Sequence, residues 1–323
     1  MKRIVRIGSA GLFISVFGFL GGCSGSANTT DTTVVETIAP ATTIALTAYP
    51  VTAGGITLDA QPMRIVSLSP THTEMLYAIG AGDQVVAVDE YSNFPAEAVA
   101  LGTKLSGFEP NVEAIAGFKP DLVVVSYDPG GLVDQLKALN IPVYIGNGAA
   151  SLDQAYEQIE QLGALTGHLD TAVQLTSQMQ SEIQAQIQVI VAQAGKLSEP
   201  VSYYYELDNT YYSVTSKTFI GQIFSMFGLI NIADTAEAGN DYPQLSSEVI
   251  VSSNPKMIFL ADTKCCGQTP ETVAARDGWA KLDAVINKNV VQLDDDIASR
   301  WGPRVVELVT SIRQAISLAT ATK

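Results

Sequence analysis

The chain has 323 residues, of which 47% are hydrophobic, so it is long enough for two domains with cores of ordinary size and is not a largely disordered protein. Its 33 acidic residues outnumber its 18 basic residues, which gives a formal net charge of −15 at pH 7. Because such a surface repels nucleic acid and anionic lipid, we expect neither as a partner.

Residues 1–22 have the pattern of a signal peptide. Lys2, Arg3 and Arg6 precede an uncharged apolar run over residues 7–20. This run is shorter than the roughly 20 residues that a membrane-spanning helix needs. The motif LGGC, ending at Cys23, resembles the bacterial lipobox, in which the cysteine is lipidated and becomes the first mature residue. We therefore expect export and a lipid anchor; the alternative is an ordinary secretory signal with an incidental cysteine.

Residues 23–46 are rich in Thr, Ser and Ala and contain too little apolar surface to order themselves. They predict a flexible spacer between the lipid and the folded part of the chain. The protein is then expected at the outer face of the cell membrane, either extracellular or periplasmic.

Residues 47–168 alternate short β-branched runs with helical patterns, which predicts an α/β lobe with a parallel sheet. The expected strands are residues 64–69, 84–90, 121–127 and 142–147, and the expected helical segments are 73–81, 112–118, 131–140 and 151–167. Ligands bind beyond the carboxyl ends of the strands in such sheets.

The turn after the first expected strand contains Thr71, His72 and Glu74. Thr71 and Glu74 have the spacing of a capping box, which predicts the start of a helix. His72 would then lie at the ligand end of the sheet, where it either contacts a ligand or faces solvent.

Residues 169–196 predict one long helix, because apolar residues recur every three or four positions and no Gly or Pro interrupts residues 170–194. A helix of this length is stiff. It either connects two lobes as a rigid element or packs as an amphipathic helix on one lobe, and these two interpretations are compatible.

Residues 197–323 predict a second α/β lobe. The expected strands are residues 201–207, 211–216, 256–262 and 289–295, and the expected helices are 219–229 and 303–320. Tyr203, Tyr204 and Tyr205 lie inside the first of these strands and are expected to pack in the core.

A short repeat relates the two lobes. Glu113 and Glu248 each begin the pattern Glu, any residue, Ile, four residues, Pro, and an apolar strand follows the proline in both places. A proline ends a helix, so each lobe is expected to contain the same short helix before a buried strand.

No residues for catalysis or direct metal binding are evident. The two histidines, His72 and His168, lie far apart in the sequence, and the motifs of zinc proteases, serine hydrolases and phosphate-binding loops are absent. The sequence thus predicts a protein that is not an enzyme and that has no resident cofactor or metal.

Aromatic residues lie in turns that follow expected strands, where a bulky, partly apolar ligand would contact them. These residues are Tyr91, Phe108, Tyr127, Tyr242 and Trp301.

Together, residues 64–88, 111–126, 141–147 and 241–262 resemble the iron-siderophore and cobalamin periplasmic-binding family of ABC importers. The resemblance covers nearly all of residues 64–320. It implies a class III fold, in which two parallel-sheet lobes are joined by a single long α-helix and move little when a ligand binds. It also implies that the ligand is handed to a membrane permease that a cytoplasmic ATPase drives.

The resemblance assigns roles to particular residues. Glu113 and Glu248 match the glutamates that dock against arginines of the permease. Asp296 and Arg300 match an aspartate and an arginine that face the ligand in the cobalamin-binding branch, whose aromatic contacts fall near Tyr91, Phe108 and Tyr242. Trp301 offers a flat surface beside Arg300. Alternatively, Arg300 pairs with Asp294, Asp295 or Asp296. His72 departs from the small residue that is common at its position.

Cys265 and Cys266 are adjacent in a protein expected to be exported, so a vicinal disulfide is expected although its geometry is strained. Two free thiols or an intermolecular bridge are the alternatives.

The sequence as a whole predicts a monomeric, lipid-anchored substrate-binding protein that captures a ferric siderophore or a corrinoid. A haem-binding importer component is the alternative, followed by a secreted lipoprotein hydrolase on the same scaffold.

Overall fold

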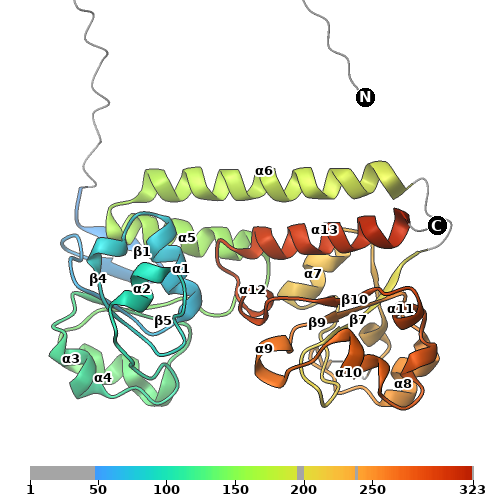
Figure 1. Cartoon of the computed structure of the whole chain (residues 1–323). Coiled ribbons are helices and arrows are strands. Elements are labelled where there is room, and N and C mark those ends of the chain that lie inside the picture. Colours follow the sequence, from blue (N-terminus) through green and yellow to red (C-terminus); the bar gives the residue numbers. More distant parts are fainter. Residues whose placement is uncertain (1–47, 195–199, 237–238, 322–323) are drawn as a thin grey trace, which may run out of the picture. The chain divides into compact units, whose positions relative to one another are not determined.

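Two four-stranded parallel sheets form the framework of the protein (Figure 1). The computed structural model describes residues 48–194, 200–236 and 239–321. The expected signal peptide, Cys23 and the whole of the expected spacer lie outside these residues. The first sheet has the order β4-β3-β5-β6, with β3 (Ile65–Ser67), β4 (Val85–Val88), β5 (Leu122–Val125) and β6 (Val143–Ile145). The second has the order β10-β9-β7-β8, with β7 (Ser202–Glu206), β8 (Ile230–Asn231), β9 (Met257–Leu260) and β10 (Val290–Gln292).

The two sheets have the same topology. In each, the first strand along the chain lies between the second and the third, and the fourth strand lies outside the third. The third strands, β5 and β9, follow α3 (Val112–Gly117) and α8 (Ser247–Ser253), which are the two helices of the sequence repeat. The N-cap side chains Asn111 and Ser246 accept a hydrogen bond from the backbone N–H three residues on in both helices. The lobes are therefore structural repeats, as the sequence predicted.

Further helices cover the sheets. In the first lobe these are α1 (Pro70–Ala78), η1 (Gly82–Gln84), α2 (Ala96–Ala100), η2 (Pro129–Gly131), α4 (Leu132–Ala138) and α5 (Leu152–Thr166). In the second they are α7 (Phe219–Ser225), η3 (Ile232–Thr235), α9 (Thr263–Cys266), α10 (Pro270–Ala274), η4 (Trp279–Lys281), α11 (Asp283–Ile286), α12 (Asp295–Ser299) and α13 (Val305–Ala321).

The long helix α6 (Leu169–Ala194) has 26 residues, which corresponds to roughly 39 Å at 1.5 Å per residue. It packs along α5 of the first lobe and α13 of the second, so it connects the two lobes (Figure 1). Its buried face includes Met179, Ile183 and Ile187, while the residues between them are mostly exposed. No helix in the part of the chain that the structure describes is both long and apolar enough to cross a membrane.

One continuous apolar core extends from the first sheet to the second. It contains Ile65 of β3, Ile183 of α6, Tyr203 of β7 and Ile312 of α13. Tyr203, Tyr204 and Tyr205 are completely buried, as expected for packing residues. Because the same core contacts both lobes and the helix between them, a large rotation of one lobe against the other would have to break it.

Two local predictions differ from the structure. Residues 211–216 form no strand: Tyr211 has a positive φ of 73°, and the backbone from Tyr211 to Thr215 bonds to the loop at residues 241–245. The hairpin of β1 (Val51–Ala53) and β2 (Ile56–Leu58) was not predicted. Gly54 and Gly55 have positive φ values in its turn, and this Gly-Gly pair between two β-branched segments is the pattern that could have predicted the hairpin.

Candidate functional site

Exposed aromatic side chains gather on the loops that follow the strands of the first lobe. Tyr91, after β4, and Phe108 form an edge-to-face pair with ring centroids 5.6 Å apart. They are 53% and 65% exposed. Tyr127, after β5, donates a long hydrogen bond from its hydroxyl to the carbonyl oxygen of Gly107, 3.4 Å away. The structure thus brings Tyr91 and Phe108 together as an apolar surface open to a ligand.

Arg300 joins this surface to the second lobe. Its guanidinium donates to the backbone oxygen of Tyr91 (3.2 Å), to Asn93 Oδ1 (2.9 Å) and to Glu74 Oε1 (2.7 Å), all in the first lobe. It also donates to Asp296 Oδ1 (2.8 Å), four residues earlier. The pairing with Asp296 was one of the alternatives that the sequence left open, whereas the pairing with Glu74 across the lobes was not foreseen. The side chain of Arg300 is only 9% exposed.

Glu74 also binds a second arginine. Arg304 donates from Nε to Glu74 Oε2 (2.9 Å) and from Nη2 to Glu74 Oε1 (2.6 Å), while its guanidinium lies 4.3 Å from the centre of the Phe94 ring. The capping box predicted for Thr71 and Glu74 is wrong. The N-cap of α1 is Ser69, which makes no side-chain cap bond, and Glu74 turns away from the helix end to bind the two arginines.

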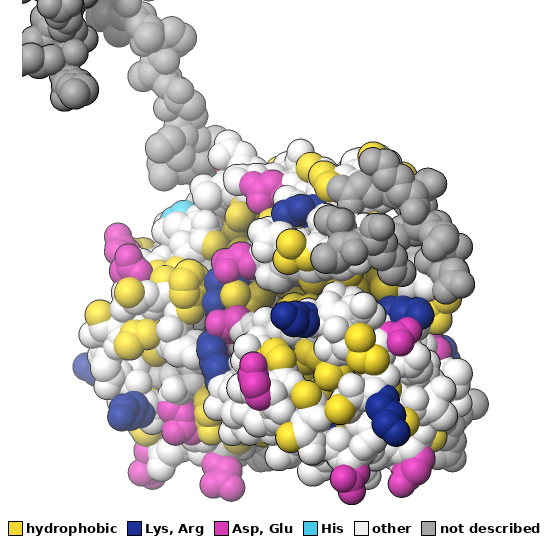
Figure 2. All heavy atoms as spheres, turned by 45° about the vertical axis from the view of Figure 1, so that its right-hand side comes forward, with side chains coloured by type: hydrophobic (Ala, Val, Ile, Leu, Met, Phe, Trp, Pro, Cys, Tyr) yellow, Lys and Arg dark blue, Asp and Glu magenta, His cyan; other side chains and the backbone are white. Residues whose placement is uncertain are grey.

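Asp296 links Arg300 to a third basic residue. Lys264 Nζ lies 2.7 Å from Asp296 Oδ2 and 2.8 Å from Asp294 Oδ2. Asn93 donates to Asp296 Oδ2 from the other lobe (3.1 Å). We call Glu74, Asn93, Lys264, Asp294, Asp296, Arg300 and Arg304 the inter-lobe polar network. Figure 2 shows basic and acidic side chains side by side near the middle of the face that it draws.

Cys265 and Cys266 are both free thiols, so the expected vicinal disulfide is not present in this structure. They lie in one turn, α9, whose backbone is held by Asp295: its carboxylate accepts from the N–H groups of Thr263, Lys264 and Cys265. Partial burial and the hydrogen bond with Cys266 raise the pKa of Cys265 to about 12.

His72 and Trp301 pack against each other where the lobes meet. Their rings meet edge to face, with centroids 5.9 Å apart. Both side chains bond to Gln158 Oε1, which lies 2.8 Å from Trp301 Nε1 and 3.1 Å from His72 Nε2. Since this oxygen only accepts, His72 carries its proton on Nε2, and Nδ1 accepts from the Ser69 hydroxyl at 2.7 Å. Burial lowers the pKa of His72 to about 4, so the ring is neutral at pH 7. A Cβ at Gly146 would lie 2.0 Å from His72 Nε2, so only glycine fits there.

Full burial contradicts the expectation that His72 faces solvent. His72 can touch a ligand only if neighbouring side chains move first. Trp301 is half-buried beside it, with its indole directed to the first lobe.

The remaining predicted residues lie apart from the inter-lobe polar network. Tyr242 is 55% exposed on the loop after β8, and its backbone N–H donates to Asn240 Oδ1. Glu113 and Glu248 are exposed at the second position of α3 and of α8, one on each lobe. Backbone hydrogen bonding at the helix start and the Ser246 hydroxyl lower the pKa of Glu248, so it is charged at neutral pH.

A buried acid pair lies at the carboxyl ends of β7 and β9, and no sequence pattern had indicated it. Glu206 accepts two hydrogen bonds of 2.6 Å from Arg276, which also lies over the ring of Trp279. The neighbouring Asp262 is completely buried, and neither of its oxygens has a hydrogen-bond partner among the described residues. Burial and the charge of Glu206 raise the pKa of Asp262 to about 7.

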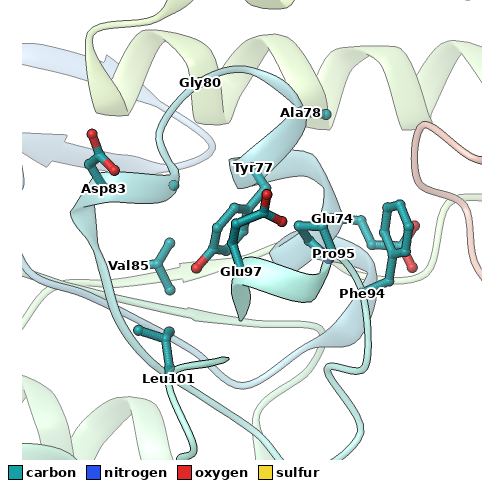
Figure 3. A pocket seen from close by; sticks show the side chains of 11 residues that line it. Glu74, Tyr77, Ala78, Gly80, Asp83, Val85, Phe94, Pro95, Glu97 and Leu101 are labelled. Carbon is teal, nitrogen blue, oxygen red and sulfur yellow. The ribbon is translucent and has the colours of Figure 1, made fainter. Parts of the chain in front are cut away.

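The surface of the folded part has two hollows. One, of about 720 Å³, lies between α1 and α2 beside the edge strand β4, and Tyr77, Asp83 and Glu97 project toward it (Figure 3). The other, of about 600 Å³, lies among α5, α6 and α7, with Tyr156, Ile183 and Phe219 in its walls. Neither is lined by the predicted aromatic residues or by Arg300. Within the described ranges, no three His, Cys, Asp or Glu side chains group in a way that could hold a metal ion.

Comparison with known proteins gives relatives over most of the chain. The family model described as "Periplasmic binding protein" matches residues 65–297. An uncharacterised ABC transporter substrate-binding lipoprotein of Bacillus subtilis is 32% identical, with 81% of this chain and 82% of that protein covered. A cobalamin-binding protein of Halobacterium salinarum is 30% identical, with 82% and 72% covered.

A solved structure has the same architecture. The periplasmic vitamin B12 binding protein of Vibrio cholerae superposes with a TM-score of 0.66 at 27% identity, and the match covers 80% of this chain and 98% of that one. The family match spans both sheets and α6, and it contains the exposed aromatic pair; Arg300 and Arg304 lie just beyond its end. The chain therefore belongs to the periplasmic binding protein family.

Proposed function

We propose that the protein is the substrate-binding component of an ABC importer. It captures a metal chelate, a ferric siderophore or a corrinoid, outside the membrane and delivers it to a permease that an ATPase drives. The protein acts as a monomer tethered by a lipid on Cys23, and it returns its ligand chemically unchanged.

The observation that carries this proposal is the exposed pair Tyr91 and Phe108, in which the backbone oxygen of Tyr91 accepts a hydrogen bond from Arg300 of the other lobe. The two lobes meet there at the loops that follow their strands, which is where α/β sheets bind ligands. A large flat apolar surface next to hydrogen-bonding groups suits a bulky chelate whose organic shell is partly apolar. The relatives named for binding cobalamin support a ligand of this size.

The transport role is supported by the position of Glu113 and Glu248. Both are exposed at the start of equivalent helices, one on each lobe, so a single partner surface with two basic sites can contact both. The B. subtilis relative named as a lipoprotein of an ABC transporter supports both the anchor and the partner.

Tryptophan fluorescence tests the binding proposal, since the chain has only two tryptophans. Trp279 is fully buried inside the second lobe, and Trp301 lies where the lobes meet. Titration with ferric siderophores, cobalamins and haem should change the emission with at least one chelate. The change should be much smaller in Trp301→Phe, with affinity checked by calorimetry, and should persist in Trp279→Phe.

Mass spectrometry of the recovered ligand separates binding from catalysis. An unaltered chelate after prolonged incubation is expected, whereas a hydrolysed product would favour the rival hydrolase. If no member of the panel binds, the proposal is wrong.

A further inference from the structure

We infer that the site selects a chelate without net negative charge and that, among chelates of equal size, it binds a cationic one most tightly. This inference rests on the proposed function and adds the charge class of the ligand to it.

The basic side chains where the lobes meet are already paired. Arg300 binds Glu74 and Asp296, Arg304 binds Glu74 through two hydrogen bonds, and Lys264 lies between Asp294 and Asp296. A ligand carboxylate or catecholate bound where the lobes meet would draw on at least one of these cations as its counter-charge. It would have to take that cation from an acid that already holds it.

Glu74 makes such an exchange unfavourable. Its side chain is 1% exposed, and its two oxygens accept bonds only from Arg300 and Arg304 among the described residues. An anion that drew either arginine away would leave a buried carboxylate with less compensation. A neutral or cationic ligand can occupy the aromatic surface without disturbing this pairing.

The exposed aromatic residues have acidic neighbours. Glu90 precedes Tyr91, Glu109 follows Phe108, Asp128 follows Tyr127, and Asp241 precedes Tyr242. None of these four acids forms a salt bridge in the described part of the chain. Aromatic faces bordered by carboxylates attract organic cations, because the ring face and the acid both carry negative potential.

The surrounding loops reinforce this potential. Besides the residues already named, the described loops after the strands carry Asp89, Asp208, Asp234, Asp262 and Asp295, against the two further basic residues Lys104 and Lys217. Burial raises the pKa of Asp89, and burial together with Glu206 raises the pKa of Asp262 to about 7, so Asp262 contributes less than a full charge at neutral pH. The net charge of these loops is still strongly negative.

One ferric chelate with three charge states tests the inference. A linear ferric trihydroxamate with a free terminal amine is cationic, its N-acetyl derivative is neutral, and its N-succinyl derivative is anionic, while the metal-binding core is the same. Calorimetry at low salt should give affinities in the order amine, acetyl, succinyl. The first and last should differ by about tenfold or more, and added salt should reduce the difference.

A corrinoid pair provides the same test on the other chelate class: a base-free corrinoid cation, and the same molecule with side-chain amides hydrolysed to carboxylates. The cation should bind more tightly. Equal affinities, or a preference for the anionic members, would contradict the charge inference while leaving the proposed function intact. If no member of either series binds, and no other chelate does, the proposed function itself fails and the inference with it.

Glu90 and Glu109 form no salt bridge and no side-chain hydrogen bond among the described residues, so they allow a matched variant. Glu90→Gln combined with Glu109→Gln should weaken binding of the amine chelate by roughly threefold to tenfold and leave the succinyl chelate unchanged or tighter. Glu182→Gln, an exposed isosteric change on α6, should alter neither affinity. The same loss for all three chelates would mean that the two acids shape the surface and do not select charge.

Discussion

At the scale of single residues, Glu74 is the one on which the inter-lobe polar network depends. It is buried, and it compensates two arginines that come from the other lobe. Glu74→Ala should lower the free energy of unfolding by about 3 kcal/mol, because Arg300 and Arg304 would keep their charge while losing their main partner. Urea denaturation measures this loss. Glu97→Gln, an exposed neighbour, should change stability little, and equal losses in the two variants would contradict the role given to Glu74.

Asp262 should make stability depend on pH. Its pKa in the folded protein is about 7, above the ordinary value of 3.8, so the folded state holds the proton more tightly than the unfolded state does. The stability that this group contributes is complete below about pH 4, declines as the pH rises toward 7, and is lost above it. Asp262→Asn cannot ionise, so its melting temperature should fall less between pH 5 and pH 8 than that of the unaltered protein. If the melting temperatures of the two proteins change equally between pH 5 and pH 8, Asp262 does not titrate in this range.

At the scale of elements, α3 and α8 are equivalent short helices that each present one exposed glutamate. Glu113→Lys combined with Glu248→Lys should abolish uptake by cells that contain the cognate permease, since both contacts with basic residues become repulsive. Ligand affinity of the purified variant should not change, because Glu113 and Glu248 lie exposed at the starts of α3 and α8 and belong neither to the aromatic pair nor to the inter-lobe polar network. Glu182→Lys on α6 is the matched control for the added charge. Normal uptake by the double variant would remove the docking role.

At the scale of the whole molecule, two features of the described residues 48–194, 200–236 and 239–321 oppose large movements. The apolar core is continuous from one sheet through α6 and α13 to the other, and direct hydrogen bonds join Arg300 to Glu74, Asn93 and Tyr91. We expect the radius of gyration measured by X-ray scattering to be the same, within error, with and without saturating chelate. A clear contraction on binding would indicate a hinge closure that this architecture does not predict.

Much of the architecture was predictable because it depends on local pattern. The alternation of apolar runs with helical spacing predicts two parallel sheets, and the repeat at Glu113 and Glu248 predicts that the lobes correspond. The uninterrupted apolar spacing of residues 170–194 predicts α6. Errors fell where the pattern was short or ambiguous: residues 211–216 are β-branched and aromatic, yet tertiary hydrogen bonds to the loop at 241–245 hold them outside any strand.

The sequence by itself determined the kinds of element, their order, the correspondence of the lobes and the aromatic residues that remain exposed, because these follow from spacing along the chain. Only the tertiary structure decided that Glu74 binds Arg300 and Arg304, more than 220 positions later in the chain, and that Asp262 lies buried beside Glu206. Charge pairing and burial depend on which loops meet when the two sheets are brought together by α6. The spacing of residues along one chain does not show which loops come into contact. The charge pairing that determines which ligands the site accepts therefore follows from the tertiary structure.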